Sequence, residues 1–344
     1  MDTYDVAIVG AGPIGLELAV ALKRRGVSYV QFDARQIGQT MSWWAAQTRF
    51  FSSNERIAIA GVPLVTVDGG KATREVYLAY LRGVVMQFGL EVRTYEPVTE
   101  VRRLEGCFEL ATTRRGVAER TRARRVVLAT GGTDRPRRLG VVGEDLPHVS
   151  HYFREAHEYF GRRLMVVGGK NSAAEAALRC FHGGAEVLFS YRRKVLPAKS
   201  IKYWILPELQ GLLDANRIVP LMETEVASIS ESEVRLRHAD GLERGHAADF
   251  VLLMTGYEAD MSLFRLLGVP LAEGTQAPVF DVRTMETGVP GVYVAGTAAG
   301  GTQDRFELFI ENCHVHVDRI VRHITGEGVG AGVNGGATYA LPES

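Results

Sequence analysis

Three glycines and one acid near the start of the chain have the types and the spacing needed to bind a dinucleotide. Gly10, Gly12 and Gly15 follow an apolar segment and precede residues with helical periodicity. In such a motif the first glycine permits a tight turn, the second lets a pyrophosphate approach the backbone, and the third lets helix and strand pack closely. Asp33, eighteen positions after Gly15, ends the next predicted strand, where a carboxylate can accept hydrogen bonds from ribose hydroxyls. The residues expected to form this first site are Gly10, Gly12, Pro13, Ile14, Gly15 and Asp33.

A second glycine motif follows another apolar segment, and its sequence is Gly-Gly-Lys-Asn-Ser-Ala over residues 168–173. Lys170 replaces the middle glycine, so the backbone is expected to approach a pyrophosphate less closely. Arg192 and Arg193 follow the next predicted strand, at the place where NAD-specific sites carry an acid. Arginine can bind a 2′-phosphate bidentately, so the sequence favours NADPH over NADH; the alternative is a solvated basic turn. The residues expected at this second site are Gly168, Gly169, Asn171, Ser172, Ala173, Arg192 and Arg193.

Two further segments end in a small residue where a predicted strand stops. Thr130 and Gly131 end one of them, and Gly296 and Thr297 end the segment that begins at Gly291. The latter resembles the C-terminal FAD motif of flavoproteins with two dinucleotide-binding domains. Such proteins usually carry aspartate where Thr297 stands, so we expect an altered contact with the ribityl chain. We assign FAD to the first glycine motif together with Thr130, Gly131, Gly296 and Thr297, and NADPH to the second.

The order of predicted elements indicates an α/β protein made of two nested Rossmann-like domains. Each glycine motif lies inside a strand–helix–strand unit, and apolar segments ending at Gly131 and Gly256 mark the places where the chain would pass between domains. Helices are predicted over about 16–25, 73–88, 172–183 and 306–324, and a small antiparallel meander over about 98–129. We expect an FAD-binding domain formed by residues 1–132 and 258–344, and an inserted NADPH-binding domain formed by residues 133–257.

Composition excludes several classes of function. The 344 residues include 40 basic and 40 acidic ones, so no net charge attracts the chain to nucleic acid or to a membrane. No apolar run is long enough to span a bilayer, and no signal peptide precedes the first strand, so we expect a cytoplasmic protein. The three cysteines, at positions 107, 180 and 313, are too far apart for a Cys-x-x-Cys redox centre or a zinc site, and no metal is expected.

The chain resembles the low-molecular-weight thioredoxin-reductase-like flavoproteins and, among them, the bacillithiol disulfide reductase family. The resemblance extends over nearly the whole chain. The segments that carry it are 41–44, 51–53, 148–157, 166–178, 202–204 (Lys-Tyr-Trp), 253–257 and 309–312. It implies reduction of a flavin by NADPH, a small disulfide as the acceptor, and a homodimer or homotetramer.

One departure from that family bears on mechanism. Members linked to bacillithiol disulfide reduction carry a cysteine in the position that Ile14 occupies here, and isoleucine cannot form a mixed disulfide. The resemblance places Cys313 on a helix whose N-terminus points to the flavin, where a thiol pKa would be lowered, so Cys313 is a weak candidate for a catalytic thiol; the alternative is a buried apolar filler. It also places Trp43 in a loop beside the flavin, where the ring would stack on the cofactor or pack in the core.

The leading interpretation is an FAD-dependent NADPH:acceptor oxidoreductase whose acceptor is a small disulfide such as bacillithiol disulfide. A ferredoxin- or flavodoxin-NADP reductase is the main alternative, because it needs no redox cysteine and takes its electrons to a small carrier protein. A flavin monooxygenase and a flavin-based redox sensor are weaker alternatives.

Overall fold

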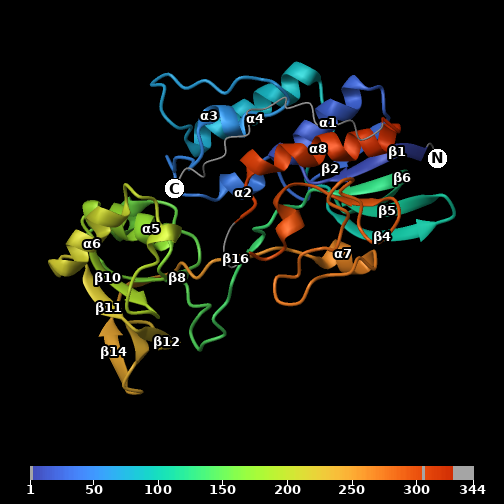
Figure 1. Ribbon diagram of the computed structural model, residues 1–344. Helices are drawn as coiled ribbons and strands as arrows, with labels where there is room; N and C mark the ends of the chain where they lie inside the picture. The colour runs from blue at the N-terminus through green and yellow to red at the C-terminus, as the bar shows by residue number, and fades with distance from the viewer. Residues whose placement is uncertain (1–2, 304–306, 328–344) are drawn as a thin grey trace. The chain divides into compact units, whose positions relative to one another are not determined.

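The computed structural model describes residues 3–303 and 307–327, and these residues divide into two compact units (Figure 1). The first unit holds residues 3–42, 47–135, 258–303 and 307–327 of the described chain. The second holds Trp43–Ala46 and Pro136–Tyr257. The second unit is therefore inserted in the sequence of the first, except for the four residues from Trp43. Residues 328–344, part of the predicted first domain, lie outside the described residues.

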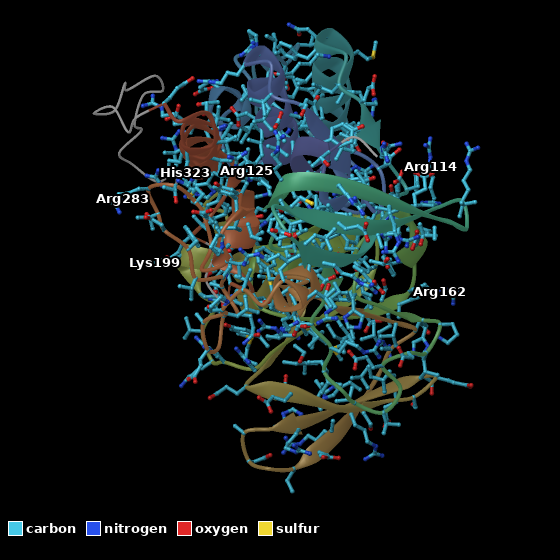
Figure 2. All side chains as sticks on the ribbon, turned by 90° about the vertical axis from the view of Figure 1, so that its right-hand side faces the viewer. Arg114, Arg125, Arg162, Lys199, Arg283 and His323 are labelled. Carbon is cyan, nitrogen blue, oxygen red and sulfur yellow. The ribbon has the colours of Figure 1, made fainter. Side chains whose placement is uncertain are left out.

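A seven-stranded sheet forms the centre of the first unit, with strand order β3-β2-β1-β6-β5-β4 and β17 paired with β6. Its strands are β1 (Thr3–Val9), β2 (Tyr29–Phe32), β3 (Val92–Arg93), β4 (Val98–Leu104), β5 (Cys107–Arg114), β6 (Val117–Leu128) and β17 (Val292–Val294). The long strand β6 pairs with β1 in parallel on one edge. On its other edge the first half is antiparallel to β5, and the last three residues are parallel to β17. β6 thus belongs both to a parallel Rossmann-type sheet and to the predicted meander. Arg114 ends β5 at the tip of the β5–β6 hairpin (Figure 2).

Helices cover one side of this sheet, where α1, α4 and α8 lie together (Figure 1). The helical segments of the first unit are α1 (Pro13–Arg24), α2 (Gln39–Ser42), α3 (Asn54–Ile57), α4 (Arg74–Phe88), α7 (Ser262–Leu266), η3 (Gly296–Gly300) and α8 (Ile310–Thr325). α4 begins where the Thr73 hydroxyl accepts a hydrogen bond from the Val76 amide, and it ends at Gly89, whose φ is +54°. Its bounds agree with the helix predicted over 73–88.

A second parallel sheet, with order β11-β10-β9-β15-β8, forms the centre of the second unit. Its strands are β8 (Val149–Ser150), β9 (Arg163–Val167), β10 (Glu186–Tyr191), β11 (Val219–Met222) and β15 (Phe250–Leu253). A separate antiparallel sheet, which the sequence did not predict, consists of β12 (Thr224–Ile229), β13 (Glu233–His238) and β14 (Glu243–Ala247). The helical segments are η1 (Ala156–Tyr159), α5 (Asn171–His182), η2 (Ala198–Ser200) and α6 (Leu206–Asp214). β7 (Arg135–Pro136) and β16 (Tyr257–Glu258), where the chain changes units, pair with each other.

Alternating side chains of β9 supply two hydrophobic cores, one on each face of this sheet. Leu164 and Val166 belong to the core that contains the buried alanines of α5. Met165 and Val167 belong to a second core that contains Ile229 of β12 and two residues of β13. Because neighbouring side chains of a strand point to opposite faces, the continuous apolar run of β9 requires a cover on both sides. The antiparallel sheet is that second cover.

No helix within the described residues is both long enough and apolar enough to cross a membrane.

Candidate dinucleotide-binding sites

The first glycine motif forms a tight turn between β1 and α1, and its three glycines meet different surroundings. Gly10 has a φ of +115°, and a Cβ there would lie 2.7 Å from the Ala129 carbonyl carbon. A Cβ on Gly15 would clash with the Gly10 carbonyl group, because it would lie 3.1 Å from the carbonyl carbon and closer still to the oxygen. A Cβ on Gly12 would meet nothing within 4 Å. Gly10 and Gly15 are thus needed by the fold itself, whereas the space beside Gly12 is free for a ligand at the start of α1.

Gln31 of β2 and Asp33, which directly follows β2, hold this turn in place. The Asp33 carboxylate accepts hydrogen bonds from the amides of Ala11 (2.7 Å) and Arg35 (2.8 Å). Burial raises the pKa of Asp33, and the two amide donors oppose that rise. Gln31, which is fully buried, donates from Nε2 to the Gly10 carbonyl oxygen (2.9 Å). Asp33 therefore has a structural role in bracing the turn, in addition to the ribose contact that the sequence predicts.

The segment that begins η3 packs against the start of α1. Ile14 is buried, and a Cβ on Gly296 would lie 3.4 Å from the Ile14 Cβ. Thr297 accepts a hydrogen bond through its hydroxyl from the Gly132 amide (2.9 Å), although 165 residues separate them. Thr297 thus joins the segments that follow β17 and β6. Ile14 occupies the position where the bacillithiol disulfide reductase family carries a cysteine. Here that position holds an apolar side chain that is buried against Gly296.

Histidines at two positions of α8 were not selected by the sequence, and they have opposite protonation preferences. His316 accepts a hydrogen bond through Nδ1 from the Gly296 amide (3.2 Å), and burial lowers its pKa to about 4. His314 lies between two acceptors, Glu17 Oε2 (2.7 Å from Nδ1) and the Arg56 carbonyl oxygen (2.9 Å from Nε2). Burial lowers the pKa of His314, but the hydrogen bond and charge of Glu17, together with the Arg56 carbonyl oxygen and the charge of Glu311, raise the net pKa. His316 is thus a neutral acceptor that fixes the backbone next to Thr297.

These surroundings fit a bound dinucleotide. The Thr130 hydroxyl is buried and has no hydrogen-bond partner among the described residues, and it follows β6 at the same sheet edge as the glycine turn. A buried hydroxyl without a partner costs free energy unless a ligand or water satisfies it. Together with the open space beside Gly12, it marks the carboxyl ends of β1 and β6, where dinucleotides bind in open α/β sheets.

The second glycine motif connects β9 to α5 and is more crowded than the first. Gly168 has a φ of +145°, and a Cβ there would lie 3.0 Å from that of Ala173, so position 168 requires glycine. A Cβ on Gly169 would overlap the ring of Tyr191, the last residue of β10. Lys170 occupies the N-cap position of α5 without a side-chain cap hydrogen bond. Ser172 is exposed in the first turn of α5.

Arginines follow β10 directly, at the same sheet edge as the second glycine motif. Arg192 and Arg193 are exposed, and neither forms an ion pair with another residue of the described chain. Asn171 accepts a hydrogen bond through Oδ1 from the Lys202 amide (3.2 Å), so its side chain holds a neighbouring loop. The two arginines are thus available to a phosphate, and Asn171 has a structural partner.

Trp43 belongs to the second unit, where it contacts two tyrosines. Its ring centroid lies 4.7 Å from that of Tyr257 and 5.1 Å from that of Tyr152. Burial raises the pKa of Tyr257. Trp43 therefore has a packing role, and its contact with a flavin stays a prediction.

Cys313 does not have the environment of a reactive thiol. It is fully buried in α8, and burial raises its pKa to about 12. This environment fits the alternative of a buried apolar filler, because loss of solvent opposes any lowering of the pKa of Cys313 by a helix N-terminus. Cys180, in α5, is also buried, and its pKa is likewise raised to about 12. Within the described residues, no group of three histidines, cysteines or acids could hold a metal ion.

Comparison with known proteins decides the family. Residues 7–296 match the pyridine nucleotide-disulphide oxidoreductase family. The chain belongs to this family. It is 36% identical over 318 residues to the bacilliredoxin reductase Bdr of Bacillus subtilis, covering 92% of this chain and 96% of the relative. The solved bacillithiol disulfide reductase Bdr of Bacillus cereus has a TM-score of 0.90 at 36% identity, covering 94% of this chain and 99% of that one. A ferredoxin–NADP reductase of Ignicoccus hospitalis is 27% identical over 296 residues, or 85% of this chain and 89% of its own length.

The predicted resemblance and the predicted fold class are therefore confirmed. A thioredoxin reductase of T. acidophilum, at 21% identity, has a TM-score of 0.72 over 94% of this chain and 99% of its own, and shows the same fold. The protein is an oxidoreductase of the pyridine nucleotide-disulphide family.

Proposed function

We propose that this protein is an FAD-dependent, NADPH-linked reductase of a small disulfide such as bacillithiol disulfide. The observation that carries the proposal is the likeness to two Bdr proteins, which extends over nearly the whole chain. The glycine turns at Gly10 and Gly168, one at the start of each unit's first α-helix, are consistent with two dinucleotides. In this assignment residues 1–132 and 258–344 bind FAD, and residues 133–257 bind NADPH. We also propose that the enzyme acts in the cytoplasm as a homodimer or homotetramer.

In the first site the chain supplies binding and orientation. The free space at Gly12 and the amides at the start of α1 would receive the FAD pyrophosphate, with the positive end of the helix dipole favouring the charge. Asp33 holds the turn and would also face ribose. Thr130 would donate its unsatisfied hydroxyl to the cofactor. When bound, the flavin supplies two-electron transfer between NADPH and the acceptor.

In the second site, Arg192 and Arg193 would bind the 2′-phosphate that distinguishes NADPH from NADH. Both guanidinium groups are exposed beside the end of β10, which suits bidentate hydrogen bonds to phosphate. The turn at Gly168 and Gly169 would receive the pyrophosphate at the start of α5.

The disulfide would be reduced without a mixed disulfide to the protein. Ile14 occupies the family's cysteine position, and Cys313 and Cys180 have pKa values raised to about 12. The net reaction converts NADPH, one proton and the disulfide into NADP⁺ and two thiols. The hydride of NADPH supplies both electrons that cleave the S–S bond.

A ferredoxin- or flavodoxin-NADP reductase is a second candidate, favoured by isoleucine at position 14, where the bacillithiol disulfide reductase family carries a cysteine. The relatives that carry the ferredoxin reductase name are more distant, as at 27% identity for that of Ignicoccus hospitalis. Anaerobic stopped-flow absorbance separates the two candidates: the protein is reduced with NADPH and then mixed with bacillithiol disulfide, ferredoxin, flavodoxin or oxygen. Reoxidation by the disulfide faster than by any other acceptor supports the proposal. Reoxidation by the disulfide no faster than by buffer would show that the activity in the Bdr names does not extend to this chain.

A further inference from the structure

The segment 192–205 follows β10 and returns to the start of α5. It begins beside Tyr191, the end of β10, and reaches Asn171, the first residue of α5, through the hydrogen bond from the Lys202 amide. β9 and β10 are parallel neighbours, with Val167 paired to Ser190. The segment therefore lies over the carboxyl ends of the two strands that flank the second glycine motif. Lys199, which lies on it, is exposed (Figure 2).

Two buried side chains and one buried ammonium group anchor this segment. Leu196 and Ile201 belong to the hydrophobic core that contains α5. Lys202 is only 4% exposed, and its Nζ lies 3.2 Å from Glu175 Oε2, one turn further along α5 than Asn171. A buried lysine is costly unless an opposite charge compensates it, so this ion pair fixes the segment in one place.

From this anchor, a series of contacts leads to an exposed aromatic ring. The Lys202 ammonium lies 5.8 Å from the ring centroid of Trp204, at the distance of a cation–π contact. Trp204 in turn meets Tyr203 at a centroid distance of 4.8 Å and an interplanar angle of 88°. Tyr203 is 66% exposed. Trp204 is also exposed, at 41%, so its edge-to-face contact is what restricts the Tyr203 ring. A ring restricted in this way loses less entropy when a ligand stacks on it.

We infer that Tyr203 is the stacking platform for the adenine of NADPH, with Lys202 as its positioning residue. The inference rests on the proposed function. If Arg192 and Arg193 bind the 2′-phosphate and the turn at Gly168 binds the pyrophosphate, then the adenine attached to that ribose lies over the same sheet edge. Segment 192–205 carries both the arginines and the exposed ring. Every base has a π-face, so an aromatic ring suits adenine without requiring a specific hydrogen bond.

The test uses adenosine 2′,5′-bisphosphate, which contains the phosphorylated adenosine end of NADPH and lacks the nicotinamide. Binding to the purified holoprotein is measured by calorimetry for wild type, Tyr203→Ala and Tyr203→Phe. Loss of a base–aromatic stack weakens binding about 5- to 150-fold, so we expect that range for Tyr203→Ala. Tyr203→Phe keeps the ring and should stay within about twofold of wild type. With NADPH, Tyr203→Ala should raise KM and leave kcat unchanged, because the adenine is remote from the reacting atoms.

Lys202→Met tests the positioning role, because it removes the ion pair and leaves Tyr203 in the chain. We expect weaker binding of the bisphosphate, with the melting temperature reported alongside to show that the variant is folded. Binding by Lys202→Met equal to that of wild type would overturn the positioning role.

The outcomes also separate this inference from the proposed function. Wild-type affinity in Tyr203→Ala, or equal losses in Tyr203→Ala and Tyr203→Phe, would overturn the stacking role while leaving the NADPH assignment in place. No binding of the bisphosphate to wild type would instead contradict the proposed NADPH site.

Discussion

Replacing Gly12 by alanine should weaken FAD binding while leaving the free energy of unfolding of the apoprotein nearly unchanged. Gly12 has φ −74° and ψ 179°, an extended conformation open to alanine, and a Cβ there meets no protein atom within 4 Å. The free energy of unfolding of the apoprotein should therefore change by less than about 1 kcal/mol. The new methyl group occupies the space through which the pyrophosphate would approach, so FAD affinity should fall at least tenfold, which corresponds to about 1.4 kcal/mol.

Gly10→Ala provides the contrast, and Gly83→Ala provides the matched control. Gly10 has φ +115° and no room for a Cβ beside Ala129, so its replacement should cost about 3 kcal/mol or more of unfolding free energy. Gly83 lies exposed within α4, with no atom within 4 Å of an added Cβ, and alanine there should stabilise the protein by about 1 kcal/mol without affecting FAD.

The assay combines urea unfolding of the apoproteins with titration of FAD followed by quenching of its fluorescence. FAD binding by Gly12→Ala as tight as that of wild type would refute the placement of the pyrophosphate. Unfolding of Gly10→Ala at the same urea concentration as wild type would refute the geometry of the turn.

Two further predictions concern cofactor choice and pH. Arg192→Ala combined with Arg193→Ala should raise the Kd for NADPH about 10- to 100-fold and change that for NADH less than threefold, as measured by calorimetry; unchanged NADPH affinity would refute the role of the arginines. His316 should make stability depend on pH, because burial lowers its pKa from 6.5 to about 4. The fold favours the neutral ring, so about 3 kcal/mol of stability is present above pH 6.5 and is lost as the pH falls towards 4. His316→Asn can accept from the Gly296 amide without titrating and should remove this part of the pH dependence in urea unfolding; an unchanged pH profile would refute the role of His316.

The sequence predicted those parts of the structure that depend on local pattern. Glycines at motif spacing between a strand and a helix gave the turns at Gly10 and Gly168, and the helix over 73–88 has a clear cap at each end. The antiparallel sheet β12–β14 was not predicted, although both faces of the apolar strand β9 need a cover. The unbroken apolar run at 164–167 was the signal that a second layer exists.

Contacts between distant residues could not be read from the sequence. The hydrogen bond from Gly132 to Thr297 joins segments 165 residues apart, and Thr297 was expected only as a substitute for aspartate. The sequence has nine histidines and does not distinguish His316 from the others. The structure does, because the Gly296 amide donates a hydrogen bond to His316 Nδ1. The burial of Cys313 depends on how α8 packs, so the sequence alone left two alternatives for it, a reactive thiol and a buried apolar filler.

We propose that this chain reduces a small disulfide with NADPH and without a protein thiol. The direct test is the yield of thiol per NADPH in a variant in which alanine replaces Cys107, Cys180 and Cys313, the three cysteines of the chain. We expect two thiols for each NADPH and a rate close to that of wild type with bacillithiol disulfide. The proposal would be contradicted if the variant stays folded and its flavin is still reduced by NADPH, yet it forms no thiol from bacillithiol disulfide where wild type does.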